Sequence, residues 1–318
     1  MRILMTNHRL TWYSGSDTYL YTLGKELINR GHTITIYSPN ISLALQGRRF
    51  LDTGFEVIDT LEKDIRKVEG RNDFDVVHGQ HNNVLSDVCD IFTELPAIFV
   101  SHGVLPELEK YPRDVAISKY IGVSEEVANY QFKNIENSQK EVIRNPIDTK
   151  RFYYSFKKPK KRLKILIASN YFHNDWEAKE IWEAVNLLNA DLEVIGTNGK
   201  MAFATEELIK NCDIGIGVGR SILEVMAMGK PAIVGDYAGY DGAITPKNYS
   251  EIRKRNFSSR TFKEQWDGKR LAKEIKKIFS GDYKQMGKNN RDIILKHHNV
   301  KTIADRFEVI YKEISKKV

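Results

Sequence analysis

Cysteine is nearly absent from this chain: 2 of its 318 residues are cysteines, Cys89 and Cys212. Each lies in an apolar stretch, and the two do not have the spacing of metal ligands. This scarcity excludes a disulfide-stabilised fold and the common zinc modules. We therefore expect two buried free thiols in a reducing compartment.

Long hydrophobic runs are also missing. The sequence has no stretch of about 18 consecutive apolar residues, which excludes a membrane-spanning helix. The chain leads directly into a strand-like run at residues 2–5, without the charged segment and apolar stretch of a signal peptide. We therefore expect a cytoplasmic protein. Its net charge of +7 leaves peripheral contact with the anionic inner face of the plasma membrane open.

The excess of basic residues is small and dispersed, with 49 Lys and Arg against 42 Asp and Glu. Such a surface attracts nucleotide phosphates, nucleic acid or acidic lipids, or it is simply a solvated Lys-rich surface. The densest basic run, residues 157–162 (KKPKKR), is typical of a linker. No zinc-finger or RNA-binding signature is present. Nucleic acid is therefore not an expected partner. Binding to random DNA would be the observation that supports a nucleic-acid-binding protein instead.

Two motifs of cofactor and metal chemistry are absent as well. Residues 7–16 do not supply the Gly-x-Gly-x-x-Gly pattern that an NAD enzyme needs after its first strand. The Asp-x-Asp stretch at 73–75 precedes a predicted strand rather than following one, so it is not placed at a ligand-binding edge. We therefore expect no metal ion and no resident cofactor.

What the sequence does contain is an alternation of short apolar runs with helical periodicity, in a chain with 41% hydrophobic and 29% charged residues. That balance is typical of a globular protein. Strands alternating with helices predict parallel sheets covered by helices on both faces. The predicted strands of the first series are residues 2–6, 33–37, 55–58, 75–77, 97–100, 120–123 and 141–143, and those of the second are 165–168, 192–195, 213–218 and 232–234.

The series restarts after the basic run, and 318 residues exceed what one hydrophobic core usually serves. We predict a first Rossmann-like domain at residues 1–156 and a second at 157–298. Residues 299–318 are predicted to form a final helix that packs back on the first domain. In parallel sheets ligands bind beyond the carboxyl ends of the strands, so residues just after strands are the candidates for function.

The strongest candidate follows the predicted strand at 213–218. A glycine-bearing loop turns there, and a helix is predicted to start near Ser221. Free N–H groups at a helix start bind phosphate, and glycines such as Gly219 let the backbone approach a ligand closely. Arg220 can add a charged fork to the phosphate. Glu224, one turn into the helix, is placed to accept bonds from both hydroxyls of a ribose.

A purely structural interpretation of the same residues stays open. Ser221-x-x-Glu224 matches the capping box, in which the serine caps the helix and the glutamate reaches back to its N–H. Gly229 and Pro231 would then end the helix and open the next strand. Local physics alone does not decide between a cap and a ribose ligand at Glu224.

The stretch at 217–236 (GVGRSILEVMAMGKPAIVGD) resembles the C-terminal half of the Glu-x7-Glu motif of family 4 retaining glycosyltransferases. That resemblance implies the GT-B fold, in which two Rossmann-like domains face each other across a cleft. In the family the second Glu, matched here by Glu224, binds the donor's ribose. The helix start, at Gly219, Arg220 and Ser221, is implied to hold the diphosphate.

Further landmarks of the family fall in order along the chain. The opening at residues 1–40 resembles the family's first strand, Gly-bearing loop, helix and second strand, which implies that Gly15 lies near the donor phosphates or the acceptor. Residues 100–103 (VSHG) resemble the strand end whose histidine, His102 here, faces the donor sugar. The loop with Gly196 and Thr197 is implied to lie near the base. Residues 75–78, 121–124 and 142–148 resemble three other landmarks.

The chain departs from the family pattern at two places. Ile216 stands where the first Glu of the motif is expected, and an isoleucine does not bind sugar hydroxyls. The Arg and Lys that the family usually has after the first strand of the second domain are missing from residues 169–176. Lys179 is the nearest cation, about a turn later, and Arg220 is the other candidate to compensate.

The resemblance implies a glycosyltransferase that moves a sugar from a nucleotide-sugar donor to a glycan, lipid-linked or cell-surface polysaccharide precursor. It further implies retention of configuration and no need for a metal. The two departures motivate an alternative, a catalytically silent relative that binds a nucleotide or a partner. A different two-Rossmann enzyme, such as an epimerase or a phosphorylase, is the other alternative, although no cofactor lysine of a phosphorylase is evident.

Overall fold

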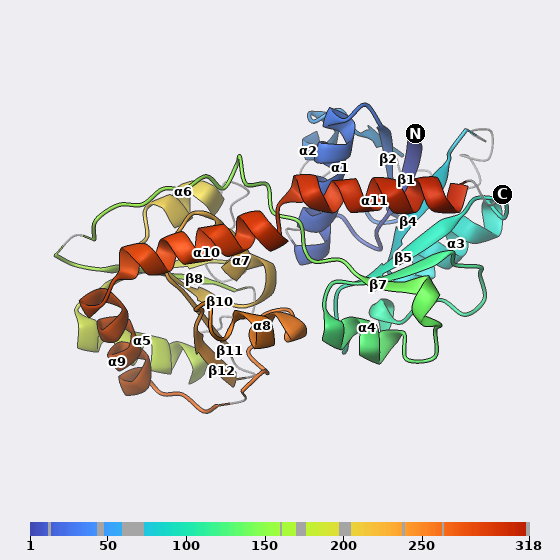
Figure 1. The fold of residues 1–318 in the computed structure, drawn as a ribbon. Helices are drawn as coiled ribbons and strands as arrows, with labels where there is room; N and C mark the ends of the chain where they lie inside the picture. Colours follow the sequence, from blue (N-terminus) through green and yellow to red (C-terminus); the bar gives the residue numbers. More distant parts are fainter. Residues whose placement is uncertain are drawn as a thin grey trace. The chain divides into compact units, whose positions relative to one another are not determined.

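The computed structural model describes residues 1–11, 14–42, 48–58, 73–159, 161–169, 176–196, 205–236, 239–262 and 264–315. The chain forms two compact units (Figure 1). The first combines Met1–Pro146 with Val300–Val318, and the second is Ile147–Asn299. Each unit contains a largely parallel sheet with helices on both faces, which confirms the predicted α/β class with two Rossmann-like domains.

The sheet of the first unit has seven strands in the order β3-β2-β1-β4-β5-β6-β7, and all of its described pairings are parallel. The order reverses between β1 and β4. The carboxyl ends of neighbouring strands at such a reversal form a natural ligand-binding crevice. The strands are β1 (Arg2–Thr6), β2 (Thr33–Tyr37), β3 (Glu56–Val57), β4 (Val76–Gln80), β5 (Ala97–Ser101), β6 (Lys119–Gly122) and β7 (Lys140–Val142).

Successive side chains of β4 show which helices cover each face of this sheet. Val77 joins an apolar cluster with α3 and α4, whereas the ring of His78 lies 5.1 Å from that of Phe307 on α11. Because successive side chains of a strand point to opposite faces, α1 and α11 cover the other face. The helices are α1 (Gly15–Asn29), α2 (Arg48–Leu51), α3 (Asn82–Ile91), α4 (Glu125–Gln131), α11 (Val300–Ser315) and the 3-10 turns η4 (Glu107–Glu109) and η5 (Asn137–Gln139).

Helix α11 is held on the first unit by polar contacts as well as by its buried face. Arg30, just after α1, pairs with Glu308 at 3.0 Å and with Asp305 at 2.6 Å. The hydroxyl of Tyr311 lies 2.6 Å from Nδ1 of His78, and complete burial lowers the pKa of His78 to about 3. The final helix therefore contacts the first unit although it follows the second in sequence.

The sheet of the second unit has five strands in the order β12-β11-β10-β8-β9, with only β12 antiparallel among the described pairings. These strands are β8 (Lys164–Ala168), β9 (Asp191–Ile195), β10 (Ile214–Gly217), β11 (Ala232–Asp236) and β12 (Gly239–Ala243). The helices are α5 (Trp176–Leu188), α6 (Thr205–Lys210), α7 (Gly219–Ala227), α8 (Tyr249–Ile252), η6 (Arg253–Arg255), α9 (Gly268–Ser280) and α10 (Tyr283–His297).

Two separate apolar clusters cover the faces of this sheet. Leu166 and Val234 pack with residues of α7, and α7 in turn packs against α10. On the other face, Ile214 and Ile216 pack with residues of α5 and α9. Helices α5 and α7 thus lie on opposite faces of the sheet.

The structure divides the chain earlier than the predicted boundary at residues 156 and 157. Ile147 donates its N–H to the carbonyl of His298 at 2.7 Å, and Phe152 is buried in the cluster around α7. Arg291 of α10 donates to the carbonyls of Thr149 and Phe152. The segment before the basic run therefore packs in the second unit, because its buried side chains and backbone bonds belong there.

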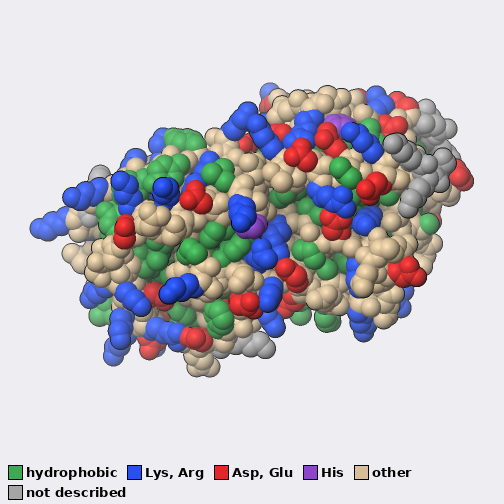
Figure 2. Space-filling model, in the orientation of Figure 1, with side chains coloured by type: hydrophobic (Ala, Val, Ile, Leu, Met, Phe, Trp, Pro, Cys, Tyr) green, Lys and Arg blue, Asp and Glu red, His purple; other side chains and the backbone are tan. Residues whose placement is uncertain are grey.

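Both cysteines are free and buried, as predicted, and burial raises the pKa of each thiol to about 12. Among the described residues, no helix is both long and apolar enough to cross a bilayer. On the face drawn in Figure 2, Lys and Arg side chains are interspersed with Asp and Glu.

Candidate functional site

The junction between β10 and α7 is built on glycines that let the helix approach the sheet. A Cβ on Gly217 would lie 2.7 Å from the carbonyl oxygen of Ala168, and one on Gly215 would lie 2.6 Å from Val225. Gly219 has φ +57°, a backbone conformation that side chains disfavour, and its N–H donates to the carbonyl of Phe257 at 2.9 Å. The helix therefore begins directly at the strand end.

The capping-box interpretation is wrong, and so is the expected helix start near Ser221. Helix α7 begins at Gly219 with Val218 as its N-cap, which makes no side-chain capping bond. The hydroxyl of Ser221 donates instead to the carbonyls of Ala168 at 2.8 Å and Val218 at 2.9 Å. Because α7 begins at Gly219, two residues earlier than the capping pattern predicts, Ser221 already lies inside the first turn.

Glu224 is a buried carboxylate with one partner in the first turn of α7 and another on α6. It is 7% exposed, and its Oε1 accepts from Nε of Arg220 at 3.1 Å. Its Oε2 accepts from the hydroxyl of Thr205, the first residue of α6, at 3.3 Å. Burial lowers the pKa of Arg220, and the neighbouring Glu224 opposes that shift. A buried charge pair of this kind is held for its geometry, since such pairs add little stability.

The amides of the first turn give this site its attraction for anions. The N–H groups in the first turn of a helix have no acceptor inside that helix, and the dipole of α7 places positive potential there. The N–H of Gly219 is already bonded to Phe257. The sequence-predicted residues Gly219, Arg220, Ser221 and Glu224 are thus gathered within the first two turns of one helix.

Ile216 is a core residue, with 1% of its surface exposed, on the face of the sheet that α5 and α9 cover. Between β10 and α7 only Val218 intervenes. The chain therefore has no loop at this strand end from which a further carboxylate could approach Glu224. The missing first Glu is a consequence of this short connection as well as of the residue type.

The sequence did not reveal a strained loop that lies against the start of α7. Asn256, Phe257 and Ser259 have φ of +52°, +56° and +61°. Each such residue costs on the order of 1–3 kcal/mol, and clusters of them mark functional sites. The carbonyl of Phe257 fixes Gly219, so this loop positions the helix start. No pattern in the sequence marks these residues, because none is a glycine.

The other residues of the second unit that were predicted to bind the sugar nucleotide do not lie together on α7. Gly196 directly follows β9, is buried, and has φ +135°. Thr197 lies outside the described residues. Lys179 is exposed on α5, the helix on the opposite face of the sheet from α7. The structure therefore does not bring Lys179 together with Arg220.

In the first unit, His102 follows β5 and is held at three points. Its backbone N–H donates to the buried carboxylate of Glu109 at 2.5 Å, and its Nε2 lies 3.0 Å from Oε1 of Gln80. The ring also makes an edge contact with Tyr19, with 4.8 Å between centroids. The imidazole is thereby held in one orientation at the carboxyl end of the strand.

Gly15 opens α1 beside the end of β1, and a Cβ added there would meet nothing within 4 Å. Next to it lies a buried acid that sequence reasoning missed. Asp17 is 1% exposed, accepts from Nδ2 of Asn7 at 3.1 Å, and has its pKa raised to about 6 by burial. The Ser14 hydroxyl that caps the helix, together with Arg49 and Asn7, partly opposes that shift.

The buried Asp17 is expected to make stability depend on pH. Its folded-state pKa of about 6 lies above the ordinary 3.8, so its contribution is present below pH 3.8 and lost as pH rises through 6. Asp17→Asn is expected to raise the free energy of unfolding at neutral pH by about 2–3 kcal/mol, at about 1.4 kcal/mol per pKa unit. Urea unfolding over this pH range measures the difference.

The exposed Asp52 provides the control, because its side chain is 70% exposed. Asp52→Asn is expected to leave the pH profile of stability unchanged. If wild type and Asp17→Asn differ by the same amount at every pH, the carboxylate of Asp17 does not titrate between 3.8 and 6 as its burial implies.

Within the described part of the chain, no three His, Cys, Asp or Glu side chains are gathered as a metal site would require. Comparison with known proteins adds to this geometry. Residues 13–151 match Glycosyltransferase Family 4. No curated protein matches the chain significantly.

Several solved structures share the fold over essentially the full length. A glycosyltransferase from Rickettsia africae superposes with a TM-score of 0.71 at 17% identity, covering 100% of this chain and 99% of that one. HepE from Anabaena, solved with UDP and glucose, gives 0.68 at 13% identity and covers 98% and 100%. The pneumococcal O-GlcNAc transferase GtfA, solved with UDP and GlcNAc, gives 0.65 at 11% identity and covers 99% of each chain.

Residues 13–151 are thus similar to Glycosyltransferase Family 4, and both units share the GT-B fold of these solved structures. The family match covers most of the first unit and residues 147–151 of the second, and the shared fold covers both units. Glycosyltransferase function is supported by that match.

Proposed function

We propose that the protein transfers a sugar from a nucleoside diphosphate sugar to a glycan acceptor, with retention and without a metal ion. In this proposal the second unit binds the donor nucleotide at α7. The observation that carries it is the buried carboxylate of Glu224, which makes no capping bond and lies one turn into a helix that opens at a strand end. A ribose hydroxyl pair is a ligand of the right chemistry for such a carboxylate.

Donor binding would use Glu224 and Arg220 together. The ribose hydroxyls donate to the carboxylate, and Thr205 is the partner that they displace or share. Arg220 bonds Glu224 through Nε, and its positive charge lies in the first turn of α7, where it would attract the diphosphate. The helix start adds backbone donors to the same anion.

The reaction breaks the bond between the anomeric carbon and the diphosphate oxygen, and negative charge grows on the leaving group. Hydrogen-bond donors that are held in place before the reaction stabilise such charge most effectively. Arg220 and the α7 amides would serve that role without a metal. His102, held by Gln80 and Glu109, would contact the donor sugar. The family match spans the segment that contains His102, and UDP in the Anabaena and pneumococcal structures makes a uridine nucleotide the first donor to test.

One observation favours a second candidate, a relative that binds nucleotide without turnover. The β10–α7 connection offers no carboxylate beside Glu224, and Ile216 is buried in the core. Such a chain would retain the nucleotide site and lack part of the contact with the transferred sugar.

A panel of UDP- and GDP-sugars tests the proposal. We expect at least one nucleoside diphosphate to raise the melting temperature, because a ligand that binds only the native state stabilises it. We further expect slow release of the nucleoside diphosphate from the matching sugar nucleotide, with the same rate in EDTA. Binding without any release would favour the silent relative. If no nucleotide raises the melting temperature, both the glycosyltransferase and the silent relative are contradicted.

A further inference from the structure

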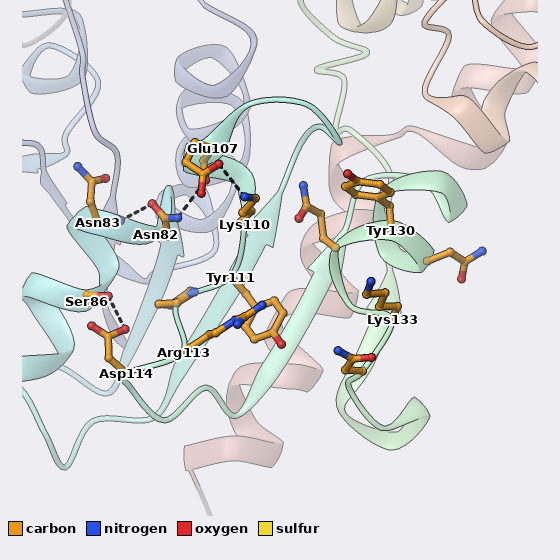
Figure 3. A pocket seen from close by; sticks show the side chains of 14 residues that line it. Asn82, Asn83, Ser86, Glu107, Lys110, Tyr111, Arg113, Asp114, Tyr130 and Lys133 are labelled. Carbon is orange, nitrogen blue, oxygen red and sulfur yellow. Dashed lines mark hydrogen bonds and ion pairs between the residues drawn. The ribbon is translucent and has the colours of Figure 1, made fainter.

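The first unit contains a cavity of about 700 Å³ next to the strand-end residues already described. It lies between the start of α3, the segment after β5 and the end of α4 (Figure 3). Its volume is within the range of small-molecule binding sites, which is about 300–1,000 Å³. All of its lining residues belong to the first unit.

One side of the cavity is tied together by hydrogen bonds. Nδ2 of Asn82 donates to the carbonyl of Glu107 at 3.0 Å, and the hydroxyl of Ser86 donates to Asp114 at 3.0 Å. Lys110 pairs with Glu107 at 2.7 Å. These contacts join α3 to the segment after β5, as Figure 3 shows. The wall is therefore formed before any ligand binds.

Two cations of the cavity have no partner within the described residues. Arg113 and Lys133 are exposed, and neither makes a hydrogen bond or an ion pair. The carboxylate of Glu107 is neutralised by Lys110, and that of Asp114 is bonded to Ser86 on the α3 side. The lining thus has one positive charge in excess, and Lys133 carries its charge on the side away from Asp114 (Figure 3). An anionic group is the complementary ligand.

The rest of the lining suits a polyhydroxylated ligand. Tyr130, 60% exposed, stands at the side opposite Asn82, and Tyr111 lies between the two sides (Figure 3). Tyrosine offers an apolar ring face together with a hydroxyl that donates and accepts. The side-chain amides of Asn129 and Asn134 add paired donors and acceptors. Sugar rings combine apolar C–H faces with hydroxyl groups in the same way.

The segment after β5 connects this cavity to His102. Glu109, on the same 3-10 turn as Glu107, accepts the N–H of His102 at 2.5 Å. Gln131 lines the cavity and donates to the carbonyl of Gly103 at 2.8 Å. The segment that holds the backbone of His102 thus also contributes residues to the cavity wall.

We propose that this cavity binds the acceptor, and that the acceptor is a saccharide carrying a carboxylate or a phosphate. Arg113 and Lys133 bind the anionic group, Tyr130 packs against a sugar ring, and the amides bind hydroxyls. This inference rests on the proposed function, since it supplies the acceptor of the same transfer reaction.

NMR titration of the full chain with three probes tests the proposal: a glucuronic acid oligosaccharide, glucose 1-phosphate and a neutral glucose oligosaccharide. We expect at least one acidic probe to bind at least tenfold more tightly than the neutral one, and the two acidic probes distinguish a carboxylate from a phosphate ligand. Arg113→Gln and Lys133→Gln should each weaken the acidic probe about tenfold, the effect of one charge-assisted hydrogen bond. Tyr130→Ala should weaken both kinds of oligosaccharide.

Lys312→Gln is the matched control, because it removes an exposed cation from α11 of the same unit, outside the cavity. It should leave every probe unaffected, and all four variants should bind UDP like wild type and melt at the same temperature. Equal binding of neutral and acidic probes, or unchanged binding in Arg113→Gln and Lys133→Gln, overturns the proposal. If no saccharide binds while UDP does, the acceptor assignment fails and the donor site stands. If UDP fails to bind, the proposed function itself fails.

Discussion

Replacing Glu224 by alanine is expected to weaken nucleoside diphosphate binding by about a hundredfold. Two ribose hydroxyls lose a charged acceptor, and each such hydrogen bond contributes about 1.5–3 kcal/mol, or roughly tenfold or more. The phosphate contacts at the start of α7 remain. Isothermal titration with UDP and GDP measures the affinity, and the loss should be larger for the nucleotide than for inorganic pyrophosphate, which has no ribose.

The same substitution leaves Arg220 buried without its partner, which has to be separated from the binding effect. Breaking a buried ion pair from one side costs about 3–5 kcal/mol of stability. Glu224→Gln keeps an acceptor for Nε of Arg220 and removes only the charge, so it should be closer to wild type in stability and still bind nucleotide poorly. Glu207→Ala, which removes an exposed carboxylate from α6, is the control. If Glu224→Gln binds nucleotide like wild type, the carboxylate is not the ribose ligand.

Replacing His102 by alanine is expected to lower kcat by about two orders of magnitude while nucleotide affinity stays the same. A fixed hydrogen-bonding group that contacts the sugar in the transition state has an effect of about 10²–10³ when removed. The nucleotide site lies in the other unit, on α7, so the affinity for nucleotide should not fall with kcat. Steady-state kinetics with the matching sugar nucleotide, together with UDP titration, separates the two quantities.

Gln80 is expected to act as a positioning residue for that histidine. Gln80→Met removes the Nε2 contact and leaves the imidazole in place, so kcat should fall by less than in His102→Ala. His102→Gln retains a side-chain donor and should recover part of the activity. Equal loss of kcat and of nucleotide affinity in His102→Ala would indicate a general disturbance of folding and contradict a role in contacting the sugar.

The periodicity of the sequence predicted the described strands of both sheets except β12, the antiparallel strand at Gly239–Ala243. The runs at 2–6, 33–37 and 232–234 are strands at those positions, and glycines and polar residues after strands marked the edge where ligands bind. These features are local, since a strand between helices shows itself by its apolar residues and their spacing. The predicted start of the helix after β10 was wrong. The capping pattern is a local feature, whereas at the observed start Gly219 bonds to Phe257, a residue far along the chain.

Several site features depend on residues far apart in the chain, and no local pattern carries them. The contact of Glu224 with Thr205, the tie of Ile147 to His298 and the cavity beside His102 all join distant segments. The raised pKa of Asp17 likewise depends on burial that the sequence does not display. Such properties arise only when packing excludes water from a polar group.

By itself, the sequence determined the α/β class, the two-domain organisation expected of the family and the candidate residues at strand ends. It did so because periodicity, glycine placement and motif order are properties of neighbouring residues. The tertiary structure decided that Glu224 pairs with Arg220 and Thr205, that Ile216 belongs to the core, and that residues 147–159 pack with the second unit. Those outcomes follow from which distant groups are buried together, and burial is settled only when the whole chain folds.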